Sequence, residues 1–113
     1  MSDKDKEFER LRAIVETIVE VARPEKVILF GSRVKGGASA ESDYDFLVVV
    51  RSVQNEREIS RRIYRALLDR RAGAAVDLVV VDAGTLDRHR DNPFYVYSQA
   101  LNEGKVFYEH GSV

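Results

Sequence analysis

The sequence lacks cysteine, which excludes a disulfide framework and thiolate zinc sites. Its two histidines, His89 and His110, do not stand at a metal-ligand spacing, so zinc chemistry is disfavoured as well. No apolar stretch approaches the roughly 18 residues that a membrane-spanning helix needs. The segment 1–10 is charged and lacks the apolar run of about 7 to 15 residues that signal peptides carry. We therefore expect a cytoplasmic protein with no membrane partner.

An excess of one charge is also lacking, because 18 basic and 19 acidic side chains give the 113 residues a net charge of -1. Such a chain does not bind nucleic acid by neutralising phosphates over its whole surface, so any charged ligand must be held locally. The apolar share of 44% is too high for a disordered chain. With neither repeats nor a long linker, the sequence predicts one domain over residues 1–113.

Hydrophobic patterns predict helices and strands that alternate along the chain. Short apolar runs predict strands at 27–30, 43–50, 75–81 and 105–108. Apolar residues three and four apart predict a helix over 8–22 that ends at Pro24. This order predicts an α/β or α+β fold, in which helices pack on a small sheet.

Polar residues and glycines predict where the remaining helices begin and end. Asn55 is expected to cap a helix that runs up to Gly73. Thr85 is expected to cap a short helical turn. Asn92-Pro93 is expected to open a further helix, which Gly104 closes before the last strand.

Gly31-Ser32 directly follows the predicted strand 27–30 and suits a phosphate group. A glycine there adopts backbone angles closed to other residues and lets main-chain N–H groups approach a ligand closely. A helical turn after Ser32 would add free N–H groups and the positive end of a helix dipole. Taken alone, the dipeptide is more typical of a plain strand-to-helix turn with Ser32 as its cap.

Three aspartates accompany the predicted strands. Asp43 and Asp45 leave the same face of one strand, about 7 Å apart. Two like charges so placed repel, unless a divalent cation or a shared proton lies between them, and their oxygens suit Mg²⁺ or Mn²⁺. Asp77 lies in the next apolar strand and would complete a three-carboxylate cluster if the two strands are neighbours. Each aspartate by itself is more typical of a strand end, and only the combination with Gly31-Ser32 favours a site.

The sequence resembles the DNA polymerase β-like nucleotidyltransferase superfamily through Gly31-Ser32, Asp43-x-Asp45 and an acid in a later apolar strand. The stretch GSRVKGGASAESDYD is most similar to minimal nucleotidyltransferases, the antitoxin partners of HEPN-domain toxins. The resemblance extends from Val27 through the segment DNPFYVYSQALNEGKVFYE and implies a small mixed β-sheet flanked by helices. Tyr44 stands where an aliphatic residue is commoner and Ala40 where proline is frequent, but Tyr44 should point away from the carboxylates.

The resemblance also implies a reaction, namely metal-dependent transfer of a nucleoside monophosphate from an NTP with pyrophosphate as the leaving group. Asp43 and Asp45 would bind two Mg²⁺ ions, with Mn²⁺ as the alternative, and Asp77 would bind one ion and help activate the acceptor hydroxyl. Gly31 and Ser32 would hold the terminal phosphates. Arg33 would compensate charge as pyrophosphate leaves, or else is a solvated loop residue.

Other nucleotide and hydrolase motifs are not present. Gly31-x4-Gly36 is followed by Gly37-Ala38, where a P-loop needs Lys and Ser or Thr. No G-x-G-x-x-G motif follows a predicted strand. A Ser-His-Asp hydrolase would depend on His89 or His110, both in charged or terminal segments.

Two features of the sequence, a basic stripe and the short length of the chain, indicate what kind of molecule could accept the transferred nucleotide. Arg57, Arg61 and Arg65 lie on one helix face, either as a solvated face or as a surface for an acidic partner or RNA. A chain this short cannot build a second wall for an acceptor cleft, so the acceptor brings its own surface: a protein, an RNA end or a second subunit. The resemblance favours AMP transfer from ATP to a tyrosine of a HEPN toxin. The alternative is a non-enzymatic antitoxin that binds nucleotide and neutralises its partner by complex formation.

Overall fold

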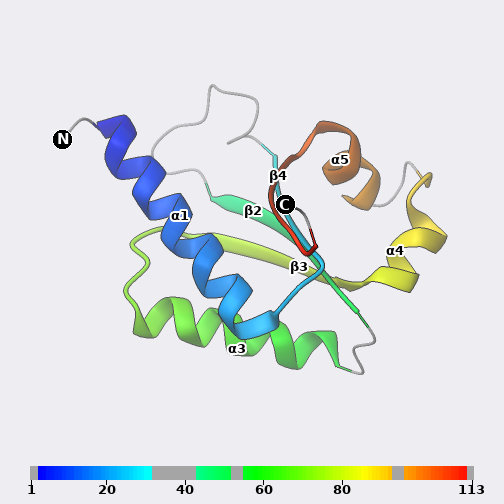
Figure 1. The fold of residues 1–113 in the computed structure, drawn as a ribbon, viewed down its shortest axis with the longest axis horizontal. Helices are drawn as coiled ribbons and strands as arrows, with labels where there is room; N and C mark the ends of the chain where they lie inside the picture. Colours follow the sequence, from blue (N-terminus) through cyan, green and yellow to red (C-terminus); the bar gives the residue numbers. More distant parts are fainter. Residues whose placement is uncertain (1–2, 32–42, 52–54, 93–95, 112–113) are drawn as a thin grey trace.

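The structure is a computed structural model that describes residues 3–31, 43–51, 55–92 and 96–111. Helices and strands alternate along it as the sequence predicts (Figure 1). In chain order they are α1 (Asp3–Ala22), β1 (Lys26–Phe30), β2 (Tyr44–Val50), α3 (Glu56–Asp69), β3 (Val76–Asp82), α4 (Ala83–His89), α5 (Val96–Glu103) and β4 (Lys105–Glu109). The assignment of residues 1–113 to one domain stays a prediction.

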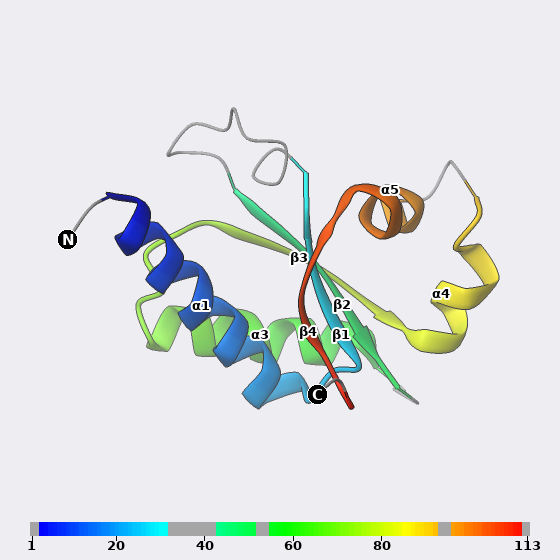
Figure 2. The same cartoon turned by 45° about the horizontal axis from the view of Figure 1, so that its top comes forward.

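The four strands form one mixed sheet in the order β3-β2-β1-β4. β1 is antiparallel to both β2 and β4, whereas β2 and β3 are parallel. Parallel neighbours need a crossover connection, which α3 supplies. With the sheet seen nearly edge-on, α1 and α3 cover one face and α4 and α5 cover the other (Figure 2). The predicted α/β class and mixed sheet are confirmed.

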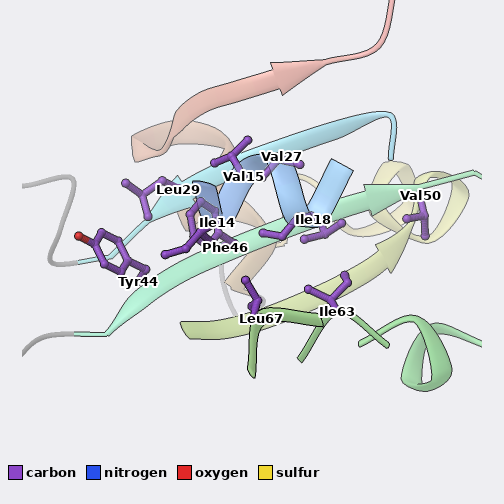
Figure 3. Packing of buried hydrophobic residues seen from close by; sticks show 11 residues of the cluster. Ile14, Val15, Ile18, Val27, Leu29, Tyr44, Phe46, Val50, Ile63 and Leu67 are labelled. Atoms are coloured by element: carbon purple, nitrogen blue, oxygen red, sulfur yellow. The ribbon is translucent and has the colours of Figure 1, made fainter. Parts of the chain in front are cut away.

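Strand β2 lies inside the sheet and is buried on both faces, which explains its unbroken apolar run. Tyr44, Phe46, Val48 and Val50 pack toward α1 and α3, and Leu47 and Val49 pack toward α4 and α5. Figure 3 shows the larger cluster, where Ile14 and Ile18 of α1 meet Ile63 and Leu67 of α3 over the sheet. The opposite face is closed by Leu86 of α4 and Ala100 of α5.

Helix α3 ends at Asp69, four residues before the predicted end at Gly73. The Ala72 N–H donates to the Leu67 carbonyl (3.0 Å) and the Arg71 N–H to the Leu68 carbonyl (3.1 Å). Arg71 carries a left-handed backbone with φ of 53°. This pairing is the C-terminal motif in which glycine is usual, and the conformation costs a residue with a side chain about 1 kcal/mol. The prediction that the helix runs up to Gly73 was wrong, because the left-handed position that usually holds glycine after a helix is occupied by Arg71.

One further helix boundary differs from the prediction, and another lies outside the described residues. The cap of α4 is Asp82, whose carboxylate accepts from the Gly84 N–H (2.9 Å), and Thr85 lies inside the helix. The sequence pattern did not indicate Asp82 as the cap, because the same residue is also the last residue of β3. Helix α5 is described from Val96, and Pro93, expected near its start, lies outside the described residues.

The close of α5 at Gly104 is confirmed. The Gly104 N–H donates to the Ala100 carbonyl (2.9 Å). A Cβ at this position would overlap that carbonyl and the Ile28 side chain. The turn into β4 therefore needs glycine, because these atoms lie too close to the Gly104 backbone for any side chain.

Asn55 caps α3 as predicted, since its side-chain oxygen accepts from the Glu58 N–H at 3.0 Å. We expect Asn55→Ala to lower the free energy of unfolding by about 1 kcal/mol, because one helix N–H loses its partner. Urea denaturation followed by circular dichroism measures the change. Asn55→Asp keeps an acceptor and should stay near the parent; equal losses in both variants would contradict the capping role.

Candidate active site

Gly31 ends β1 and places its backbone directly against the Asp45 side chain. Its φ is +82°, in the left-handed region that favours glycine. A Cβ added at Gly31 would overlap the Asp45 carboxylate and lie 3.3 Å from its Cγ. The left-handed backbone expected of a glycine directly after the first strand is confirmed, and the absence of a side chain there leaves room for the Asp45 carboxylate.

Asp45 and Asp77 are brought together by the parallel pairing of β2 and β3, in which they are direct register partners. Opposed residues in parallel strands point to the same face of the sheet. Asp45 alternates with Tyr44 and Phe46, which lie in the α1 and α3 core, so the two carboxylates belong to the face of α4 and α5. The condition set by the sequence, that the third strand lies beside the second, is confirmed.

Asp43 immediately precedes β2 and is exposed, as is Asp77. A backbone hydrogen bond joins the segments that carry Asp43 and Asp77, because the Tyr44 N–H donates to the Ala75 carbonyl (2.9 Å). Tyr44 itself is 1% exposed and stacks on Phe46 with ring centroids 6.4 Å apart. The expectation that Tyr44 points away from the carboxylates is confirmed, so its aromatic ring serves the core.

The electrostatics of the three carboxylates favour a bound cation or proton. Burial, and then the charges of Asp77 and Asp43, raise the pKa of the Asp45 carboxyl above its usual value of 3.8. This shift records that the three groups interact, because each nearby negative charge makes ionisation of Asp45 less favourable. A positive ion at this point would reverse the effect.

The donor set fits a metal ion that arrives with a nucleotide. Oxygen ligands suit Mg²⁺ and Mn²⁺, and Mg²⁺ is usually held by one or two carboxylates together with substrate phosphates. Within the ranges that the structure describes, no three acidic or histidine side chains are grouped so as to hold a metal by themselves. Asp45 and its neighbours therefore fit an ion whose coordination phosphate oxygens complete.

Two predicted site residues, Ser32 and Arg33, lie outside the described residues, together with the helical turn expected after Ser32. Of the predicted set, the structure brings together Gly31, Asp45 and Asp77, and places Asp43 beside them. Reasoning from the sequence missed the contact between Gly31 and the Asp45 carboxylate. No local sequence signal gives this contact, because it follows from the antiparallel register in which Phe30 pairs with Asp45.

In the described part of the chain, no helix is long and apolar enough to cross a bilayer.

Comparison with known proteins gives a family and a fold. The family described as "Polymerase beta, Nucleotidyltransferase" matches residues 12–112. The search of curated proteins found no significant match. A candidate nucleotidyltransferase from Sulfolobus solfataricus is 24% identical, with a TM-score of 0.61 over 90% of this chain and 79% of that one.

Two solved toxin-antitoxin structures are also similar. A mutant of the toxin-antitoxin MntA-HpeT has a TM-score of 0.61 at 17% identity, over 88% of this chain and 73% of that one. A toxin-antitoxin with AMP-PNP has a TM-score of 0.60 at 20% identity, over the same shares of the two chains, 88% and 73%. At these identities the likeness shows the fold alone.

Proposed function

The chain belongs to the polymerase β nucleotidyltransferase family, and from this premise we propose that it transfers AMP from ATP to a hydroxyl group of a partner protein. The observation that carries the proposal is the register pairing of Asp45 with Asp77 beside Gly31. It places two carboxylates from different strands next to a glycine whose backbone lies against one of them. The resulting transferase is of the EC 2.7.7 type.

In the proposed reaction the acceptor oxygen forms a bond to the α-phosphorus, the bond to the bridging oxygen breaks, and pyrophosphate leaves. Asp43 and Asp45 would hold both divalent cations, and Asp77 would hold one of them and take up the acceptor proton. Bound Mg²⁺ would supply charge compensation for the phosphates and would align the attacking and leaving oxygens. Gly31 and Ser32 hold the terminal phosphates, and Arg33 faces the charge that develops on pyrophosphate.

The proposed acceptor is a tyrosine of a HEPN toxin, so that the chain acts as its antitoxin. Support comes from the resemblance of the segment 31–45 to minimal nucleotidyltransferases and from the fold shared with toxin-antitoxin structures. A Tyr hydroxyl on a protein also removes the need for an acceptor cleft within this small chain. An RNA end is less well supported as the acceptor, since the chain as a whole carries a net charge of -1 and does not attract phosphates over its whole surface.

The test incubates the purified chain with each α-labelled NTP, Mg²⁺ and the protein encoded next to it. We expect label from ATP on the partner, none with EDTA, and none with the Asp43→Asn/Asp45→Asn double variant. Label on RNA instead of on the partner protein would show that the acceptor is RNA. A complex that forms without any label would refute transfer and leave the non-enzymatic binding module as the function.

A further inference from the structure

We infer that the outer face of α3, with the groove between its end and the start of the edge strand β3, docks an acidic segment of the acceptor protein. The inference rests on the proposed function, because it names the surface that the acceptor would use. From Glu56 to Arg71 the chain has six arginines and three acidic residues, a net charge of +3 in a chain whose total is -1. Positive charge is therefore concentrated on α3 together with Arg70 and Arg71, which follow it.

The groove is apolar at its centre and has a volume of about 410 Å³. Leu68 is 77% exposed and Tyr64 41%, which is unusual for large apolar side chains. They lie one helical turn apart, so they form a continuous apolar strip. The groove is lined by Tyr64, Leu67, Leu68, Arg71, Ala72, Gly73, Ala74 and Val76.

Arginines without partners surround this strip. Arg61 is paired with Glu58 (3.4 Å), and Arg70 is paired with Glu20 across to α1. Arg57, Arg65 and Arg71 are exposed and make no ion pair or side-chain hydrogen bond to any residue that the structure describes. Three unpaired guanidinium groups around an apolar strip are complementary to carboxylates that flank an apolar anchor.

Arg71 is the most informative of the three. Its left-handed backbone, with φ of 53°, suits glycine, yet an arginine occupies it and lines the groove. Arg23 offers a comparison, because it has the same conformation after α1, with φ of 47°, and does not line this groove. The backbone conformation by itself therefore does not distinguish Arg71; its exposed side chain at the groove does.

The groove and the candidate active site lie at the same end of the edge strand β3, on opposite faces of the sheet. Val76 lines the groove on the α3 face, and the next residue, Asp77, the register partner of Asp45, belongs to the other face. β3 is an edge strand, but two of its N–H groups already have acceptors on α3: Leu78 donates to the Tyr64 hydroxyl (2.8 Å) and Asp82 to Glu56 (3.2 Å). Strand addition is hindered there, so the partner docks through side chains on α3.

A protein fits this surface better than RNA. RNA binding would favour an uninterrupted basic surface, whereas Glu58 and Asp69 interrupt the arginines and Leu68 offers no polar group. The groove between α1 and β4, about 490 Å³ with Phe8 62% exposed, is lined by Arg12 together with Glu16 and Glu20. It has no excess of positive charge and serves as the control surface.

The experiment measures by calorimetry, without nucleotide, the affinity of the chain for the protein encoded next to it. Arg65→Glu and Leu68→Asp should each weaken binding about ten-fold or more, because a charge pair becomes repulsive or an apolar anchor becomes charged. Phe8→Asp should leave the affinity unchanged. Binding should also weaken as salt is raised.

Arg71→Gly separates docking from folding. Relief of the left-handed strain should raise the melting temperature by about 4 °C, while the affinity for the partner falls. Arg23→Gly should give a similar rise with no loss of affinity. A variant that is more stable yet binds less well is not explained by damage to the fold.

Three outcomes overturn the docking surface but not the proposed acceptor. The affinity for the partner protein is lost only in Phe8→Asp, or it is equal in all variants. In the third outcome, the α3 variants bind a labelled RNA oligonucleotide less well while their affinity for the partner protein is unchanged. The absence of any complex with the unaltered chain overturns both the docking surface and the proposed acceptor. A complex that depends on α3 but receives no label from ATP supports docking and refutes transfer, so the two failures are distinguishable.

Discussion

Asp45→Asn is expected to lower AMP transfer by a factor on the order of 10³ while making the metal-free chain more stable. Asp45 is the carboxylate that touches Gly31 and pairs in register with Asp77, so its loss removes a cation ligand at the centre of the proposed site. The estimate corresponds to loss of a group that acts directly on developing charge. Opposite effects on activity and stability are typical of a residue retained for function.

The gain in stability has a defined pH dependence. The pKa of the Asp45 carboxyl is raised in the folded chain, so the folded state holds the proton more tightly than the unfolded state. The free energy of unfolding therefore falls as the pH rises from 3.8 through the raised pKa, and it stays lower at neutral pH. Asparagine does not titrate, so the variant lacks this fall and is the more stable protein above that range.

Urea denaturation at several pH values, with EDTA present, measures the difference, and Mg²⁺ with ATP then tests the ligand role. Addition of both should raise the melting temperature of the parent chain more than that of Asp45→Asn. Asp87→Asn makes the same exchange in an exposed ion pair with Arg90 (3.5 Å) and should change neither property appreciably. An Asp45→Asn chain that is less stable at neutral pH would contradict the repulsion among the three carboxylates.

Gly31→Ala is expected to reduce transfer about 100-fold, because displacement of a catalytic group by about 1 Å costs that much. The new Cβ would overlap the Asp45 carboxylate, which must turn away from its position beside Asp77. The left-handed backbone, with φ of +82°, adds about 1 to 2 kcal/mol of strain for a residue with a side chain. Both effects come from one methyl group.

Gly111→Ala separates strain from displacement. Gly111 has nearly the same φ, +81°, but a Cβ there meets nothing within 4 Å. Its transfer rate should stay close to that of the parent chain, whatever its stability. Label transfer at saturating ATP, measured beside melting curves, distinguishes the two variants, and similar rates in both would show that Gly31 does not position Asp45.

Much of the fold was predictable from local patterns. The apolar runs of β1 and β2, the helical spacing of α1 and the cap at Asn55 all depend on residues close in the chain, and all are confirmed. The failures occurred where one residue serves two elements or departs from the usual type. Asp82 both ends β3 and caps α4, and Arg71 occupies a glycine position, so neither gave the expected local signal.

The candidate site was predictable in its members but not in its geometry. Gly31, Asp43, Asp45 and Asp77 stand out because a glycine after a buried strand and carboxylates in apolar strands both need a reason. The roles of these residues, and those of Ser32 and Arg33, stay predictions. The fold did decide that Gly31 touches the Asp45 carboxylate, since this contact follows from the pairing of β1 with β2.

The sequence by itself determined which segments form strands and helices, and which residues are the candidates for the site, because side-chain pattern and residue type are local properties. Only the tertiary structure decided that Asp77 lies opposite Asp45 and that Leu68 and Arg71 line a groove at the same end of β3. The physical reason is that a parallel register is set by the crossover through α3 and by packing on both faces of the sheet. Asp45 and Asp77 are more than 30 positions apart in the chain, and no local pattern encodes their pairing.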